Sequence, residues 1–237
     1  MEITTMISEI ALSKGYTSFW EEFFPWLARY SQTINKDLST RLYAPLSLSD
    51  EPQHRSINNI IAFTHYKNLC VDKAFVFKKS VVKAKQVASK FPRNSLSSYR
   101  LTPINLKIIM FQVDKLLYYY GEGTIVFPSF PGCGVLSNCI GDIIKGNKLI
   151  EVKAGERGII MSDLKQLIIY CALNWLNKIN PYQIEEVELF NPRQGLRWTL
   201  NLRIFLNTIS DFSLEELFDN MGKYLSDMSN EIVLDIS

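Results

Sequence analysis

A tight turn constrains the fold of this chain more than any other stretch of its sequence. Residues 141–155, GDIIKGNKLIEVKAG, consist of two apolar runs separated by Gly146 and Asn147. A two-residue loop that contains glycine and asparagine is a favoured way to join two antiparallel strands. The loop length also fixes which residues of the two strands face each other. The sequence therefore predicts a β-hairpin with a defined register.

The predicted register places two carboxylates opposite each other. With Lys145 paired to Lys148 beside the loop, the pairs further out bring Asp142 opposite Glu151. The Cβ atoms of directly opposed residues lie about 4.5–5.5 Å apart, and Lys153 shares this face because side chains alternate along a strand. Opposed like charges destabilise a sheet, and partial burial strengthens their repulsion.

A divalent cation between the two carboxylates would reverse the sign of their interaction. Mg²⁺ is typically held by one or two carboxylates together with waters and phosphate oxygens. A neighbouring ammonium, such as that of Lys153, is suited to orient a water or to stabilise charge that develops on a phosphate. The alternative is a solvated hairpin face whose charges never meet a metal, since a D…ExK pattern is short and degenerate.

The helix expected after the hairpin carries a polar stripe on an otherwise apolar surface. Asp163, Gln166 and Tyr170 are spaced i, i+3 and i+7, so they share one face. An apolar stripe runs beside them, formed by Leu164, Leu167, Ile168, Cys171 and Trp175. This arrangement indicates that the helix faces a wet site. In the alternative interpretation, Gln166 and Tyr170 only satisfy nearby backbone groups.

Strand and helix patterns alternate through the chain after residue 100. The expected strands are 124–130, 135–144, 148–154, 185–191 and 196–202, and the expected helices are 104–123, 162–178 with Ser162 as N-cap, and 211–227 with a Ser213–Glu216 capping box. The sequence thus predicts an α/β core over residues 101–237, with a mixed central β-sheet flanked by helices.

The first hundred residues have a different pattern and are expected to form a helical N-terminal region. Helical segments cover 18–34, divided at Pro25, and 58–91 as two helices or one broken helix. The turn-rich stretch 91–103 is the candidate boundary. Net charge also changes, with 14 Lys and Arg against 8 Asp and Glu in residues 1–100, and 12 against 16 in residues 101–237. A basic N-terminal part is weakly compatible with a polyanionic partner.

Composition excludes several classes of protein. Hydrophobic residues make up 47% of the 237, enough for a sizeable core, and the formal net charge is only +2. The four cysteines form no CxxC pair and only two histidines are present, which argues against a structural zinc site. The most apolar segment contains Asp163 and Lys165, so we expect a buried helix and not a membrane span. Without a signal-peptide pattern, the expected compartment is the cytoplasm.

These motifs together resemble the catalytic core of the PD-(D/E)XK nuclease superfamily. The resemblance rests on G-D-x-I, a short turn, L-I-E-V-K-A-G, and a helix with D-x-x-Q-x-x-x-Y. It is closest to the RecB-like branch, whose members carry a Q-x-x-x-Y helix motif. The match covers roughly residues 130–175, and Gly141 stands where the superfamily name has a proline.

The resemblance implies a restriction-endonuclease-like core and a set of roles. Asp142 and Glu151 would bind Mg²⁺ or Mn²⁺, and Lys153 would assist attack of water on a phosphodiester. Gln166 and Tyr170 would support the site and contact nucleic acid. Many members add an acidic ligand from an upstream helix, for which Glu122, Glu21 and Glu22 are the candidates here, with Glu122 preferred.

The expected function is therefore metal-dependent hydrolysis of DNA. The resemblance favours a component of a prokaryotic restriction or phage-defence system and is compatible with a homodimer. A partner protein or the helical N-terminal region would supply the targeting. A non-catalytic scaffold or nucleic-acid-binding subunit is the main alternative, with an aromatic interface at Phe19, Trp20, Phe23, Phe24 and Trp26 that is equally compatible with core packing. A ribonuclease is a third interpretation, because the motif does not distinguish the sugar.

Basic residues outside the motif are candidates for phosphate contacts. Lys79, Lys83 and Lys90 fall on one side of an expected helix, which is either a phosphate-binding face or a solvated one. Arg157 follows the ExK strand closely, and Arg193 lies in the turn between two expected strands.

Overall fold

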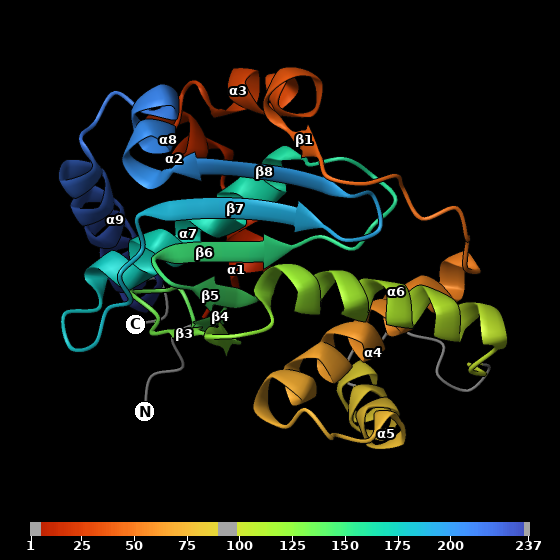
Figure 1. Ribbon diagram of the computed structural model, residues 1–237. Helices are drawn as coiled ribbons and strands as arrows, with labels where there is room; N and C mark the ends of the chain where they lie inside the picture. Colours follow the sequence, from red (N-terminus) through yellow and green to blue (C-terminus); the bar gives the residue numbers. More distant parts are fainter. Residues whose placement is uncertain (1–5, 90–98, 235–237) are drawn as a thin grey trace.

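The computed structural model describes residues 6–89 and 99–234 and consists of one central sheet with helices on both faces (Figure 1). The sheet has six strands in the order β1-β8-β7-β6-β5-β2, which are Thr40–Arg41, Leu196–Asn201, Glu186–Asn191, Lys148–Val152, Ile143–Lys145 and Thr124–Val126. Only β6 and β7 are parallel, and the other neighbouring pairs are antiparallel. A separate ribbon pairs β3 (Ser129–Phe130) with β4 (Cys139–Ile140). The expectation of a mixed sheet flanked by helices is confirmed.

The hairpin of β5 and β6 has the expected register. Lys145 pairs with Lys148, and Ile143 pairs with Ile150. The two-residue loop is Gly146-Asn147, and Gly146 has a φ of 60°, which L-residues with side chains adopt only at a cost. The turn therefore fixes the strand pairing that leads to Asp142 and Glu151.

Replacing Gly146 with valine is expected to lower the free energy of unfolding by about 1–2 kcal/mol, the cost of a left-handed β-branched residue. No heavy atom lies within 4 Å of a Cβ built at this position, so steric collision adds nothing. Gly146→Asn is the matched control and should be less destabilising, because asparagine tolerates this region better. Urea denaturation of both variants measures the effect, and equal stability of Gly146→Val and wild type would contradict it.

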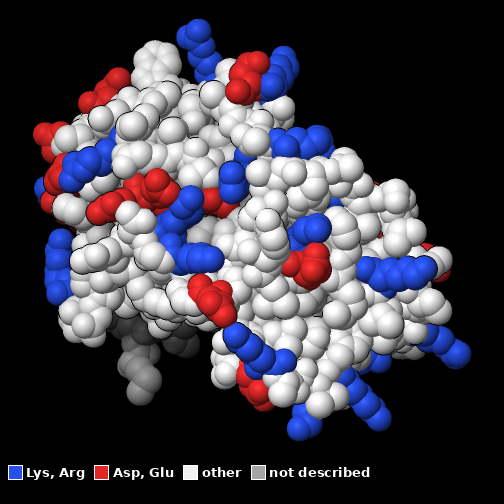
Figure 2. Space-filling view, viewed as in Figure 1, with Lys and Arg blue, Asp and Glu red and all other residues white. Residues whose placement is uncertain are grey.

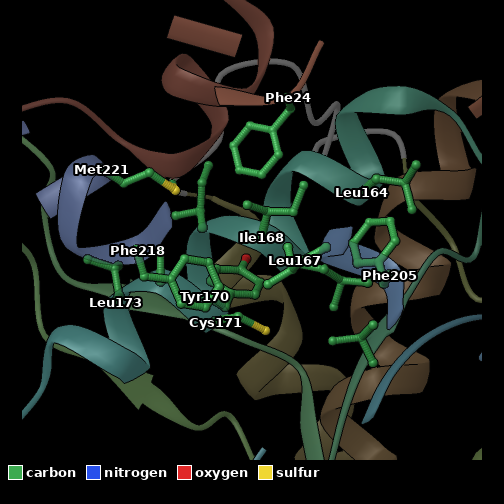
Figure 3. Close-up of a cluster of buried hydrophobic side chains, with 14 of the residues drawn as sticks. Phe24, Leu164, Leu167, Ile168, Tyr170, Cys171, Leu173, Phe205, Phe218 and Met221 are labelled. Atoms are coloured by element: carbon green, nitrogen blue, oxygen red, sulfur yellow. The ribbon is translucent and has the colours of Figure 1, made fainter. Parts of the chain in front are cut away.

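Helix α7 (Met161–Leu176) connects β6 to β7 and lies across one face of the sheet. Its apolar side chains meet those of the surrounding helices in the main core, as Figure 3 shows for Leu167 and Ile168 of α7, Phe205 and Phe218. The helices that contribute to this core are α1 (Glu9–Lys14), α2 (Thr17–Phe23), α3 (Leu27–Thr33), α8 (Leu202–Ile209) and α9 (Leu214–Leu234), together with Ile34 of the π-helical turn η1 (Ile34–Leu38).

Three helices lie on the opposite side of the sheet near β5, β6 and β7, and two of them contact it. They are α4 (Pro52–Val71), α5 (Phe77–Ala88) and α6 (Pro103–Tyr120). Tyr66 of α4 and Leu116 of α6 are buried against Ile143 and Ile150 of the sheet. Helix α5 does not reach the sheet core and packs on α4 and α6 through Ala84 and Ala88. The α4–α5 pair consequently projects from the sheet (Figure 1).

The N-terminal residues are helical, and they pack into the same core as the α/β part. Phe19, Trp20, Phe23 and Phe24 are buried in the main core, so these four aromatic residues do not form an exposed interface. Trp26 is 49% exposed. Most of the boundary predicted at 91–103 lies outside the described residues. Among the described residues, no helix is both long and apolar enough to cross a membrane.

Several local predictions were wrong. The expected strand 124–130 is divided into β2 and β3, and only Cys139–Ile140 and residues 143–144 of the expected strand 135–144 are extended, because the chain turns at Gly141 and Asp142. Helix α7 begins one residue before Ser162, and its first turn is held by the Asp163 carboxylate, which accepts the Ile160 N–H at 3.0 Å. Helix α8 was missed because the strand pattern of β8 continues into it. The Ser213–Glu216 capping box at the start of α9 is confirmed, with Ser213 N–H donating to Glu216 Oε2 at 3.1 Å.

Candidate functional site

Asp142 lies directly before β5, whose pairing with β6 begins at Ile143. Its backbone carbonyl accepts the Phe127 N–H at 2.9 Å, and the preceding Gly141 N–H donates to the Pro128 carbonyl at 2.9 Å, so the chain before β5 pairs with the β2–β3 segment and not with β6. The Asp142 side chain takes the place of a backbone partner for β6, because its Oδ2 accepts the Val152 N–H at 2.8 Å. The carboxylate is thereby fixed beside β6, next to Glu151.

Glu151 is buried in the middle of β6, with only 5% of its surface exposed. Its Oε1 accepts a hydrogen bond from Lys153 Nζ at 2.7 Å, but its Oε2 is buried without a hydrogen-bond partner. A buried carboxylate oxygen without a partner is costly and requires an explanation. A cation is one explanation, because it would supply the missing interaction. A proton on Asp142 is the other, because a hydrogen bond between the two carboxyl groups contributes to the raised pKa of Asp142.

Lys153 connects the hairpin to α7. Its Nζ donates to Gln166 Oε1 at 2.5 Å as well as to Glu151. Asp163 Oδ1 lies 3.8 Å from the same ammonium. The structure thus brings together Lys153 and Gln166, two residues to which the resemblance assigns a place in one site.

The local electrostatics are those of a charge-rich buried site. Burial and the neighbouring Glu151 carboxylate raise the pKa of Asp142 well above its ordinary value of 3.8. Burial lowers the pKa of Lys153, but the carboxylates of Glu151 and Asp163 outweigh it, and the net pKa is raised. The lysine therefore remains an ammonium at neutral pH, while the Glu151 carboxylate and burial both disfavour ionisation of Asp142.

Tyr170 is buried close enough to Glu151, Asp142 and Glu9 for each of the three carboxylates to influence its pKa. The Tyr170 ring stacks on Phe130 with a centroid distance of 5.3 Å. Burial and the Glu151 carboxylate raise the pKa of Tyr170, and Glu9 and Asp142 act in the same direction. Glu9 of α1 is half-buried, and sequence reasoning missed it because it belongs to no motif.

Asp163 holds the loop between β6 and α7. Its two carboxylate oxygens accept hydrogen bonds from Arg157 at 2.6 and 2.9 Å. Bidentate pairs of this kind fix geometry as well as charge. Arg157 is still about half exposed and lines the cleft beside the site, which is compatible with the phosphate contact expected of it.

The site opens into a cleft of about 610 Å³ between α4, α5 and the loop after β6. Asp142 and Lys153 line it, together with Lys67 of α4, Lys83 of α5 and Arg157. Asp142 is the single acidic residue among its described lining residues. Figure 2 shows Lys and Arg side chains along the lower right of the molecule, over α4 and α5. The cleft is therefore chemically suited to an anion.

Several candidates from the sequence lie elsewhere. Glu122 is exposed after α6, ion-paired with Lys73 at 3.0 Å, so the structure does not bring it to Asp142 and Glu151. Glu21 and Glu22 are exposed on α2. Arg193, the less favoured candidate for a phosphate contact, is 2% exposed and does not line the cleft. Of the expected lysine face, Lys79 is exposed outside the cleft and Lys90 lies outside the described residues.

Arg193 instead forms a buried ion pair. Its guanidinium donates to both carboxylate oxygens of Asp50, at 3.1 and 2.5 Å. Asn58 Nδ2 also donates to Asp50 at 2.9 Å, and Arg193 Nε donates to Asn59 at 3.2 Å. This network fixes the start of α4 to the β7–β8 turn. Asn59 Nδ2 also donates to the Ala154 carbonyl at 2.9 Å, which ties α4 to the loop after β6.

The two carboxylates fit a divalent cation whose remaining ligands are not protein groups. Within residues 6–89 and 99–234, no cluster of three or more His, Cys, Asp or Glu side chains is arranged to hold a metal. Mg²⁺ usually keeps several waters and binds through one or two carboxylates plus phosphate oxygens. No protein-family model, curated protein or solved structure matches this chain. The function must therefore be argued from the chemistry of the site itself.

Replacing Asp142 with asparagine is expected to raise the free energy of unfolding of the metal-free protein at pH 7 by on the order of 1 kcal/mol, because it removes one of two opposed charges. The asparagine oxygen can still accept the Val152 N–H. One kcal/mol corresponds to about 2–4 °C in Tm for a chain of this size. Mg²⁺ should stabilise the wild type and leave Asp142→Asn nearly unchanged.

The pH dependence of stability tests the same charge pair. Because the pKa of Asp142 is raised, the folded chain retains a proton that the unfolded chain releases near pH 3.8. The wild type should therefore lose stability as pH rises from about 3.8 through the raised pKa, and the variant should lose less over this range. Thermal denaturation in EDTA across this range measures it, and identical profiles for the two proteins would contradict the repulsion.

Proposed function

We propose that this chain is a metal-dependent nuclease that hydrolyses DNA phosphodiester bonds. The observation that carries the proposal is the buried, unpartnered Oε2 of Glu151 beside Asp142 and Lys153. A Mg²⁺ or Mn²⁺ ion held by Asp142 and Glu151 would supply Lewis acidity toward a phosphate oxygen and lower the pKa of a bound water.

Lys153 is the residue of the chain suited to act on the reacting groups. An ammonium has three N–H donors, and two of them are bonded to Glu151 and Gln166. The third remains for the attacking water or for an oxygen of the phosphate, where the positive charge stabilises the negative charge that develops. Gln166 acts as a positioning residue, because its Oε1 holds the ammonium between the hairpin and α7.

The surrounding charges support a polyanionic substrate. Lys67 and Lys83 line the cleft that contains Asp142 and Lys153, and Arg157 lies at the same cleft. The resemblance to the PD-(D/E)XK superfamily supports the same assignment, and we include a restriction-endonuclease-like arrangement of the sheet and α7 in the proposal. The setting in prokaryotic restriction or phage defence is an expectation from that resemblance alone.

A cleavage assay tests the proposal. Purified protein is incubated with linear duplex, circular duplex and single-stranded DNA, and with RNA, each with Mg²⁺, Mn²⁺ or EDTA. We expect cleavage of at least one DNA with either metal and none in EDTA. Cleavage of RNA but no DNA would favour the ribonuclease. Tight binding without cleavage under every condition would overturn the enzyme and favour a scaffold or binding subunit.

A further inference from the structure

We propose that the cleft beside the site binds an unpaired nucleobase of the strand that is cut, so that the substrate is single-stranded at that nucleotide. The inference names a substrate class for the proposed nuclease. Only the cleavage of the bound strand rests on the proposed nuclease function. Base binding itself needs no metal and no reaction. The two can therefore be tested separately.

The wall of the cleft is largely apolar and partly aromatic. Phe63 of α4 and Phe127, which follows β2, both line it, and their rings lie edge to face with centroids 5.1 Å apart. Ile60, Val87 and Leu116 add aliphatic surface. A phosphate backbone alone does not require such a surface, whereas an unstacked base packs against aromatic side chains.

The backbone at Phe127 is consistent with a functional role for this wall. Phe127 has a φ of 61°, an unusual value for a bulky residue. Its N–H donates to the Asp142 carbonyl at 2.9 Å, so the strained residue lies directly beside the site. Strained residues of this kind are concentrated at binding and catalytic sites.

Basic side chains border the apolar wall. Lys67 Nζ lies 4.2 Å from the centroid of the Phe127 ring, and Lys83 Nζ lies 4.8 Å from that of Phe75. Within the part of the chain that the structure describes, neither ammonium has a carboxylate partner within ion-pair distance. They are thus free to pair with the phosphates on either side of a bound base.

The size and position of the cleft match a base next to the reacting phosphate. Its volume of about 610 Å³ lies within the range of roughly 300–1,000 Å³ that is typical of small-molecule pockets. Asp142 and Lys153 line the same cleft, so one nucleotide can place its base at Phe63 while its phosphate lies near the Asp142 carboxylate and the Lys153 ammonium. A base inside a duplex is stacked on both sides and would first have to leave the helix.

Equilibrium binding in EDTA tests the inference without cleavage. Fluorescence anisotropy is measured with three labelled ligands of equal length: a single DNA strand, a blunt duplex, and a strand of abasic residues. Phe63→Leu removes the ring and keeps an apolar side chain, and its fold is checked by thermal denaturation. Lys83→Gln removes a charge that lines the cleft, and Lys79→Gln removes an exposed charge on the same helix outside it.

We expect the wild type to bind the single strand more tightly than the duplex. Phe63→Leu should weaken binding of the strand with bases roughly 5- to 150-fold, as expected for one stacked base, and leave the abasic strand unchanged. Lys83→Gln should weaken binding of both strands, and Lys79→Gln should have a much smaller effect. Equal losses on both strands in Phe63→Leu, no loss at all, or equal affinity for the duplex would overturn the base site.

The outcome separates the two proposals. Base-dependent binding without cleavage in any metal would contradict the nuclease function and would still support the base site. Efficient cleavage within duplex DNA that is unaffected by Phe63→Leu would contradict the base site and would still support the nuclease.

Discussion

Lys153→Met is expected to reduce the rate of DNA cleavage by about 10²–10³-fold, the usual effect of removing one group that stabilises charge in a transition state. Methionine is similar in length to lysine but lacks the ammonium, so the space between β6 and α7 stays filled. The physical reason is the loss of an ammonium that lies 2.7 Å from Glu151 Oε1 and 2.5 Å from Gln166 Oε1. Single-turnover cleavage with saturating Mg²⁺ measures the effect.

Lys145 offers a control on the same hairpin. It is exposed, and its Nζ donates to the Tyr119 carbonyl and not to the site. Lys145→Met should therefore cleave within about 2-fold of the wild type, as expected for a surface change away from the chemistry. Equal rates for Lys153→Met and the wild type would remove Lys153 from the mechanism, whatever role the carboxylates have.

Asp50→Ala is expected to lower the free energy of unfolding by about 3–5 kcal/mol, because it leaves the guanidinium of Arg193 buried without its charge partner. The Asp50 side chain is fully buried and that of Arg193 is only 3% exposed. For a chain of this length, the loss corresponds to a fall in Tm of roughly 6–20 °C. The network also positions α4 against the loop after β6, so the variant should bind nucleic acid less well.

Denaturation of Asp50→Ala beside Asp114→Ala measures this effect. Asp114 is exposed on α6 and is ion-paired with the adjacent Lys115, so its removal should change the free energy of unfolding by no more than about 0.5 kcal/mol. A loss below 1 kcal/mol in Asp50→Ala would show that the buried pair contributes little to stability.

Acid should weaken the same network. Burial raises the pKa of Asp50, but the hydrogen bonds from Arg193 and Asn58 outweigh it, and the net pKa is lowered. The stability that this carboxylate contributes is therefore present above its unfolded pKa of about 3.9 and is lost as pH falls through the lower folded value. The difference between wild type and Asp50→Ala should shrink at the most acidic pH that the fold survives.

The sequence predicted best those features that depend on local chemistry. A Gly-Asn turn specifies a hairpin without reference to the rest of the chain, and the alternation of strands carries the register outward from it. The pairing of Ile143 with Ile150 followed from this rule. Strand alternation placed Lys153 on the face of Glu151, and helical spacing placed Gln166 on the face of Asp163, but their contact was expected only from the family resemblance.

Features that depend on distant contacts could not be predicted in the same way. Arg193 lies in a turn, which normally indicates exposure, and only the fold reveals that Asp50 meets it from 143 positions away. The approach of α4 to the loop after β6 creates the cleft, and nothing in the spacing of Phe63 or Lys67 indicated it. Helix α8, by contrast, could have been predicted from the sequence. Its buried residues have helical spacing and follow a capping asparagine, Asn201; they are Leu202, Phe205, Leu206 and Ile209.

The central claim is that Asp142 and Glu151 together hold a divalent cation. Crystals of the protein soaked with Mn²⁺ test it most directly, through the anomalous scattering of the metal. The account predicts one peak within about 2.1 Å of an oxygen of each carboxylate, one of them Oε2 of Glu151. A structure at saturating Mn²⁺ with no peak between Asp142 and Glu151, and with Oε2 of Glu151 still without a partner, would contradict it.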